Sequence, residues 1–254
     1  MPVEASGPHR YLHVLRDPPL DGPTNMARDE ALLYCERVAP AALRIYFWDP
    51  PTISLGYFQR FTDVAKLPAD VRDLPIVRRA TGGGAILHDR EITYSLLLDE
   101  SIPIARKAPV ELYRTVHDCW RTVLVQAGFE TSLAPEEFPM PSPRSGPFFC
   151  FERPGRTDLL HDGAKLLGSA QRRIPGRVLQ HGSLMLEQRF RTHPGADLHA
   201  PSHNAAESWI EQFISELSER LHLIPQPQVW SDALLADADQ RRERYACAEW
   251  TQRR

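Results

Sequence analysis

The stretch RRATGGGAILHDREITYS, from Arg78 to Ser95, places three consecutive glycines between a pair of arginines and an apolar, β-rich run. Glycine has no Cβ, so such a triplet suits a loop that needs positive φ or that lays bare backbone against a ligand. The two arginines would add permanently charged, forked donors for a carboxylate or a phosphate. A glycine-rich hairpin turn with solvated arginines fits the same letters, because short glycine motifs also match by chance. The stretch therefore predicts either a binding loop or a plain turn.

The flanks of the triple glycine predict strands on both sides. Residues 76–79 and 85–88 are β-rich, and residues 92–98 continue as a further strand. A Rossmann or P-loop phosphate cradle needs a helix N-terminus directly after its glycines, and the Gly-Lys-Ser/Thr of a P-loop is missing here. The pattern thus excludes a dehydrogenase or a P-loop kinase.

Elsewhere the chain alternates predicted strands and helices. Strands are expected over residues 43–48 and 52–57, which we expect to pair with each other. Helices are expected over 25–36 with Thr24 as N-cap, over the amphipathic segment 109–127, and over 205–221 and 231–250. The proline-rich span 134–147 is expected to be a loop.

Composition limits the classes of function. The 254 residues, 42% hydrophobic and 25% charged, predict one catalytic domain over 1–254. The net charge of −3 gives no basic field for nucleic acid. The N-terminus lacks the apolar core of a signal peptide and no apolar run approaches a membrane span, so we expect a cytoplasmic protein with no membrane partner. Four scattered cysteines without CxxC spacing predict neither a metal site nor a disulfide framework.

A second segment carries a family resemblance. It runs FFCFERPGRTDLLHDGAKLLGSAQRR from Phe148 to Arg173, followed by LQHGSLML from Leu179 to Leu186. Together with the triple-glycine stretch it resembles the lipoate-protein ligase and octanoyltransferase branch of the biotin/lipoyl protein ligase superfamily. The segments NMARDEALL and YACAEW are similar to that family's first helix and closing segment, so the resemblance covers most of the chain. It implies an α+β fold in which a mixed β-sheet core is flanked by helices. The GRGRxG-type loop expected of biotin ligases is absent.

The resemblance also implies a catalytic pair. Cys150 occupies the position upstream of the GxK motif where one branch of octanoyltransferases carries its nucleophile, and Lys165 is the lysine of that motif. A cysteine can accept an acyl group as a thioester, and a nearby cation can favour the thiolate and hold a carbonyl oxygen. By composition alone, the phenylalanines around Cys150 would also fit a buried packing cysteine, and Lys165 a solvated lysine.

Further residues are assigned to the acyl or acyl-adenylate site by the same resemblance. His88 and His181 are ambiguous on their own, since a turn histidine bonded to backbone would give the same pattern. An apolar tunnel for the acyl tail would be lined by Leu55, Ile86 and Leu167. The substrate-binding residues implied by the family motifs are Arg79, Thr81, Gly82, Gly83, Gly84, His88, Gly168, Ser169, Ala170 and His181.

Two enzyme mechanisms and one non-catalytic role remain open. The first moves octanoate from octanoyl-acyl carrier protein through a Cys150 thioester to a lysine of a lipoyl domain, in the glycine cleavage H protein or a dehydrogenase E2 subunit, with no cofactor. The second is lipoate-protein ligation, in which ATP and Mg²⁺ form an acyl-adenylate. Cys150 favours the transferase, whereas Gly155–Leu159, GRTDL, resembles a ligase element. The third is a catalytically silent protein that binds lipoyl domains.

Overall fold

The computed structural model describes residues 10–36, 38–138, 146–199 and 203–254. Its described residues form an eight-stranded sheet in the order β11-β1-β2-β6-β10-β9-β8-β7 and a three-stranded sheet in the order β4-β3-β5. In the large sheet β1 pairs in parallel with β11 and β2, and the remaining pairs are antiparallel. The expected mixed sheet with flanking helices is confirmed. The strands are β1 (Tyr11–Leu20), β2 (Ala41–Trp48), β3 (Thr52–Leu55), β4 (Ile76–Arg78), β5 (Ile86–His88), β6 (Arg90–Asp99), β7 (Thr131–Leu133), β8 (Leu159–His161), β9 (Ala164–Ile174), β10 (Arg177–Glu187) and β11 (Ile224–Gln228).

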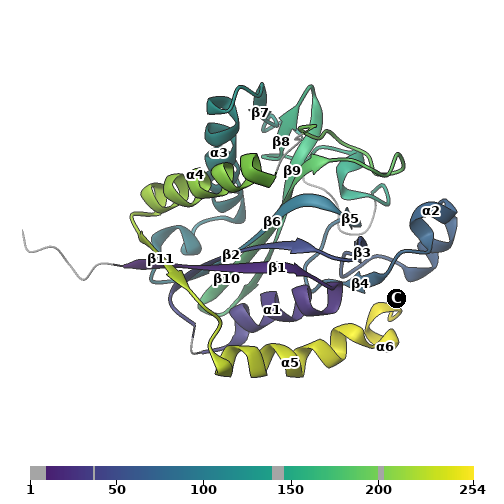
Figure 1. Ribbon diagram of the computed structural model, residues 1–254, viewed down its shortest axis with the longest axis horizontal. Helices are drawn as coiled ribbons and strands as arrows, with labels where there is room; N and C mark the ends of the chain where they lie inside the picture. The colour runs from purple at the N-terminus through teal and green to yellow at the C-terminus, as the bar shows by residue number, and fades with distance from the viewer. Residues whose placement is uncertain (1–9, 37, 139–145, 200–202) are drawn as a thin grey trace, which may run out of the picture.

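Helices cover both faces of the large sheet, α3 and α4 on one side and α1 and α5 on the other (Figure 1). This explains the unbroken apolar run of β6, because successive strand residues point to opposite faces and both faces are buried. Leu96 and Leu98 join the core under α3 and α4, and Leu97 joins the core under α1 and α5. The helices are α1 (Gly22–Tyr34), α2 (Ala69–Arg72), α3 (Pro109–Gln126), α4 (His203–Leu221), α5 (Asp232–Ala246) and α6 (Ala248–Thr251), with 3₁₀ turns η1 (Phe61–Lys66), η2 (Pro103–Arg106) and η3 (Cys150–Glu152). Within the part of the chain that the structure describes, none of the helices combines the length and the hydropathy of a membrane-spanning segment.

The predicted elements are found, with corrections to a helix cap, a strand pairing, several missed strands and one interrupted helix. The N-cap of α1 is Asp21, whose carboxylate accepts the Thr24 N–H at 2.7 Å, so Thr24 is not the cap. The strands over residues 43–48 and 52–57 do not pair, because the chain turns at Asp49-Pro50-Pro51 and β3 enters the small sheet. Strands β1, β7, β8, β9, β10 and β11 were not predicted at all. The single helix predicted over residues 231–250 is interrupted at Cys247, between α5 and α6. Part of the predicted loop 134–147, residues 139–145, lies outside the described residues.

The two sheets meet at the triple-glycine loop, which joins β4 to β5 within the small sheet. The predicted need for positive φ is met at Gly83, where φ is +97°. The C-terminal segment reaches the same place, since the indole N–H of Trp250 donates to the carbonyl of Arg78 at 2.8 Å. The loop is therefore held between the small sheet and the end of the chain, beside the large sheet.

Candidate active site

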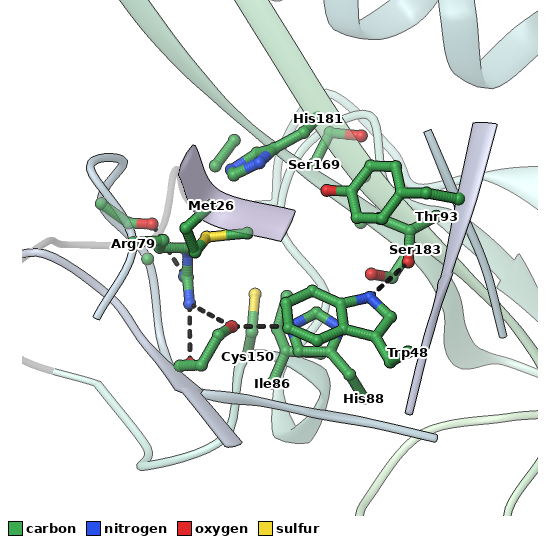
Figure 2. A pocket seen from close by; sticks show the side chains of 17 residues that line it. Met26, Trp48, Arg79, Ile86, His88, Thr93, Cys150, Ser169, His181 and Ser183 are labelled. Carbon is green, nitrogen blue, oxygen red and sulfur yellow. Dashed lines mark hydrogen bonds between the residues drawn. The ribbon is translucent and has the colours of Figure 1, made fainter. Parts of the chain in front are cut away.

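A cavity lies where the glycine loop and β5 face the large sheet (Figure 2). It gathers most of the residues predicted from the sequence motifs, although they come from segments far apart in the chain. Lys165, Thr81 and Gly84 do not line it but contact residues that do. The lining residues are Met26, Tyr46, Trp48, Ser54, Arg79, Gly82, Gly83, Ile86, His88, Thr93, Cys150, Gly168, Ser169, Ala170, His181, Gly182 and Ser183.

Cys150 and Lys165 form a close pair at this cavity. The Nζ of Lys165 lies 3.3 Å from the Sγ of Cys150 and 2.8 Å from Oδ2 of Asp158, and the lysine side chain is 2% exposed. Burial alone would lower the pKa of Lys165, but the charges of Asp158 and Cys150 outweigh it and raise the pKa above its ordinary value. The ammonium therefore stays charged beside the sulfur, where it stabilises negative charge.

The backbone of Cys150 is tied to the glycine loop. Its N–H donates to the carbonyl of Ala85 at 2.8 Å, and the N–H of Ala85 donates to the carbonyl of Phe148 at 2.7 Å. A β-carbon on Gly84 would lie 2.8 Å from the backbone nitrogen of Cys150, closer than real Cβ contacts allow. The third glycine of the triplet thus permits the close approach that directs the sulfur into the cavity, between Arg79 and Trp48 in Figure 2.

The two arginines of the loop are bonded to main-chain carbonyls. Arg79 donates to the carbonyls of Ser54, Gly82 and Gly84 at 2.9, 2.8 and 2.7 Å, and burial lowers its pKa to about 10. Arg78 donates to the carbonyls of Gly56, Gln59 and Thr251. Both guanidiniums therefore fix the shape of the loop, and Arg79 also presents part of its surface to the cavity.

His88 and His181 each bridge a hydroxyl and a carboxylate. His88 lies 2.7 Å from Ser54 Oγ and 2.6 Å from Glu91 Oε1. His181 lies 2.7 Å from Thr81 Oγ1 and 2.9 Å from Asp29 Oδ2. Their ring nitrogens bond side chains and not backbone, so they are not the turn histidines that the sequence left as an alternative.

Ser169, in the cavity wall, belongs to a buried hydrogen-bond chain. Its hydroxyl lies 2.6 Å from both Tyr94 Oη and His117 Nε2, and His117 Nδ1 lies 2.6 Å from the carbonyl of Thr157. Burial lowers the pKa of His117 to about 4, so this histidine is neutral and its Nδ1–H donates to the carbonyl. The chain fixes Ser169 and ends next to Asp158.

Several residues at the site were missed from the sequence. Asp158 was noted only as part of GRTDL, and nothing in that motif indicated its ion pair with Lys165. The indole of Trp48 stacks on the ring of His88, with centroids 3.7 Å apart, and donates to Thr93 Oγ1 at 2.9 Å. Of the three residues proposed for an acyl tunnel, Ile86 lines the cavity, whereas Leu55 and Leu167 lie fully buried in the cores.

Comparison with known protein families finds a match over most of the chain. A model described as the lipoyl protein ligase A/B catalytic domain matches residues 21–223. An octanoyltransferase LipM of Geobacillus kaustophilus (strain HTA426) is 42% identical over 171 residues, and this alignment spans 64% of the present chain and 61% of that protein. An octanoyltransferase LipM of Brevibacillus brevis is 35% identical over 266 residues, covering 91% of this chain and 94% of that protein.

The fold also matches solved structures. A protein of T. acidophilum assigned as a lipoate protein ligase, solved with bound lipoic acid, superposes with a TM-score of 0.74 over 96% of this chain and 100% of its own. The sequence identity is 18%, so this likeness concerns the fold alone.

Proposed function

This chain belongs to the lipoyl protein ligase A/B catalytic family, and from that membership we propose that it is an octanoyltransferase acting through a thioester on Cys150. The donor is octanoyl-acyl carrier protein, and the acceptor is the lysine of a lipoyl domain in a glycine cleavage H protein or a dehydrogenase E2 subunit. The observation that carries the proposal is the Cys150 Sγ facing the cavity with the Lys165 ammonium 3.3 Å away.

The first half-reaction loads Cys150. Its thiolate, stabilised by Lys165, attacks the carbonyl carbon of the donor thioester, and the bond from that carbon to the carrier protein's sulfur breaks. The carrier thiolate leaves and takes a proton from solvent. Lys165 lies close enough to the sulfur to donate to the carbonyl oxygen as negative charge develops there.

The second half-reaction removes the octanoyl group from Cys150. The acceptor amine attacks the octanoyl carbonyl carbon, an amide bond forms, and the bond from carbon to Cys150 Sγ breaks. The sulfur leaves as a thiolate, again held by Lys165, and the amine gives up one proton. Neither half needs ATP, so no cofactor enters this route. The proposal places the enzyme in the cytoplasm, a reducing compartment that keeps free thiols such as Cys150 reduced.

The ligase alternative uses the same cavity differently. There ATP and Mg²⁺ would activate a free acid, and Lys165 would contact the acyl-adenylate without a covalent enzyme intermediate. Among the described residues, no three acidic, histidine or cysteine side chains cluster as metal ligands. The aspartate of GRTDL, which resembles the ligase element, pairs with the lysine beside Cys150 and so serves the transferase as well. The relatives named octanoyltransferase favour the thioester route.

Intact-mass spectrometry tests the proposal. The enzyme is mixed with octanoyl-acyl carrier protein without ATP, and in parallel with octanoic acid, ATP, Mg²⁺ and a lipoyl domain. We expect a hydroxylamine-sensitive octanoyl adduct in the first mixture that is lost in Cys150→Ser and kept in Cys247→Ser, a matched cysteine outside the cavity lining. Acylation of the lipoyl domain only with ATP, with no adduct on the enzyme, would identify a ligase. A lipoyl domain that binds but is never acylated would identify the non-catalytic role.

A further inference from the structure

Ser54, His88 and Glu91 form a hydrogen-bonded array in the wall of the cavity. A glutamate carboxylate only accepts, so the Nδ1 of His88 carries the proton that goes to Glu91 Oε1. The Nε2 of His88 then accepts the hydrogen bond that the Ser54 hydroxyl donates, at 2.7 Å. Arg79 donates to the same Ser54 oxygen at 3.2 Å, which fixes the hydroxyl in this direction. The array runs from a cavity-facing hydroxyl through a neutral imidazole to a carboxylate.

The surroundings hold this array rigidly. Glu91 Oε1 also accepts the hydroxyls of Thr93 at 2.6 Å and Ser183 at 3.0 Å. The second oxygen, Glu91 Oε2, is buried without a partner among the described residues. Trp48 stacks flat on the imidazole, at an interplanar angle of 8°. A buried carboxylate with spare acceptor capacity next to a fixed imidazole is arranged to stabilise an imidazolium.

The proposed transfer leaves one proton without a destination. When the acceptor amine attacks, its nitrogen must lose a proton, whereas Cys150 leaves as a thiolate that needs none. Lys165 cannot accept that proton, because its ion pair with Asp158 keeps it as an ammonium. Another base facing the same cavity has to take it.

We propose that Ser54 and His88 form this base: Ser54 takes a proton from the acceptor amine and passes its own to Nε2 of His88, and Glu91 stabilises the resulting imidazolium. The inference rests on the proposed octanoyl transfer and adds a role for residues outside the Cys150–Lys165 pair. The balance closes, since the amide and the Cys150 thiolate form together and the one released proton resides on His88 until it returns to solvent. Ser54 is the catalytic residue here, and His88 acts through it.

The charges around His88 keep it ready to accept. Burial lowers its pKa, the Glu91 carboxylate opposes this, and Arg79 and His181 add to the lowering. The ring of His193 also faces the Glu91–His88 pair and is neutral, because burial lowers its pKa to about 4. With a pKa below its ordinary value of 6.5, His88 is neutral at pH 7 while Lys165 is charged, a separation of acid and base roles by environment.

A second array, Thr81–His181–Asp29, resembles the first but is less suited. Asp29 also binds the guanidinium of Arg44 at 2.7 Å and the hydroxyl of Tyr46 at 2.9 Å, so both of its oxygens are engaged elsewhere. The hydroxyl of Thr81 does not line the cavity, whereas Ser54 does. The geometry therefore favours Ser54 and His88.

Single-turnover kinetics separate this role from a structural one. The octanoyl enzyme is formed first, freed of donor, and mixed either with a lipoyl domain or with hydroxylamine. Hydroxylamine is a weakly basic amine, so its nitrogen loses the proton released on attack to water without a base from the protein. The variants are Ser54→Ala and His88→Gln, with His161→Gln, a histidine of β8 outside the cavity, as matched control. With the loading rate of Cys150 measured separately for each variant, we expect both site variants to lose about 10²- to 10⁴-fold in transfer from the loaded enzyme to the lipoyl domain and to keep the reaction of that loaded enzyme with hydroxylamine.

The pH profile gives a second readout. The ratio of the wild-type transfer rate to the rate of His88→Gln should decrease as the pH falls and His88 becomes charged, because a protonated imidazole cannot accept a further proton. The relay would be overturned if the variants lost rate equally toward the lipoyl domain and hydroxylamine, or if the rate ratio between wild type and His88→Gln did not depend on pH. Either result would leave these residues a packing role only. Unchanged transfer in both variants would also overturn it while leaving the octanoyltransferase intact. If wild-type enzyme forms no octanoyl adduct, the thioester route fails and the relay fails with it.

Discussion

Gly168 and Lys165 lie on the same strand, β9, and the end of the lysine side chain occupies the space where a β-carbon on Gly168 would lie. Such a carbon would overlap Cε and Nζ of Lys165 and would approach Oδ1 of Asp158 to 3.5 Å. Because Gly168 has no side chain, it leaves the space in which the buried Lys165 side chain turns back toward Cys150. It accounts physically for a glycine three residues after the lysine in the GAKLLGSAQ motif.

The variant Gly168→Ala should disable the first half-reaction. The added methyl forces Nζ away from Sγ, and a displacement of about 1 Å at a reacting group can cost on the order of 10²-fold in rate. We expect the octanoylation rate of Cys150, followed by intact mass, to fall by about that factor. Arg172→Ala, an exposed position on the same strand, should load normally. Wild-type loading in Gly168→Ala would mean that Lys165 need not lie where the structure has it.

Asp158→Asn should weaken both stability and loading. The substitution leaves Lys165 as a buried cation without its carboxylate partner at 2.8 Å, and breaking a buried pair in this way costs about 3–5 kcal/mol. We expect the urea midpoint to fall accordingly. Asp118→Asn serves as control, because its partners Arg121 and Arg220 lie at the surface, where an ion pair contributes about 0–1 kcal/mol. Equal losses in the two variants would argue against a buried Lys165–Asp158 pair.

His193 should make stability depend on pH. Burial between Phe149 and Phe151 lowers its pKa from 6.5 to about 4, so between these values the unfolded chain binds a proton that the folded chain does not. Stability from this group is complete above about pH 6.5 and is lost as the pH falls toward 4, by about 1.4 kcal/mol per pH unit. Urea unfolding measured from pH 8 to pH 5 should show that the free energy of unfolding falls less steeply with decreasing pH in His193→Phe than in the wild type. The two slopes should differ by about that amount. Parallel wild-type and variant profiles would place the ring in water.

The sequence predicts best where one local pattern decides the structure. The apolar spacing of residues 109–127 predicted α3, which buries Leu112, Val116 and Trp120 as expected. The strands around the triple glycine were also predicted, because β-rich runs and glycine breaks are local signals. The Cys150–Lys165 pair was foreseen only through the family motifs, since no spacing rule brings two residues fifteen positions apart into contact.

What the sequence did not predict depends on distant partners. Strand β11, IPQPQ, holds two prolines, which normally exclude a strand, but it lies at the sheet edge and pairs only with β1, where missing N–H groups are tolerated. The pairing of β2 with β3 was wrong because both are β-rich and adjacent, and only tertiary packing assigns them to different sheets. Asp158 became a site residue only when β8 placed it beside Lys165.

Ile86 is expected to influence which acyl-chain length the enzyme prefers. Ile86 lies beside Cys150 in the cavity wall and is the one residue of the predicted acyl tunnel that lines the cavity (Figure 2). If the octanoyl tail packs on it, Ile86→Ala removes apolar contact that contributes about 0.8 kcal/mol per buried CH₂. We expect the preference in kcat/KM for an octanoyl over a butanoyl donor to fall about tenfold, mainly through the KM of the octanoyl donor.

Leu87→Ala separates this effect from lost packing. Leu87 follows Ile86 on β5 but points into the core of the small sheet, so its truncation should destabilise the fold by about 2–5 kcal/mol without changing the ratio of the two donors. The comparison requires both variants to be assayed well below their unfolding temperatures. A ratio that changes equally in the two variants would mean that the tail does not lie along Ile86, and that another face of the cavity, such as the one formed by Met26 and Tyr46, holds it.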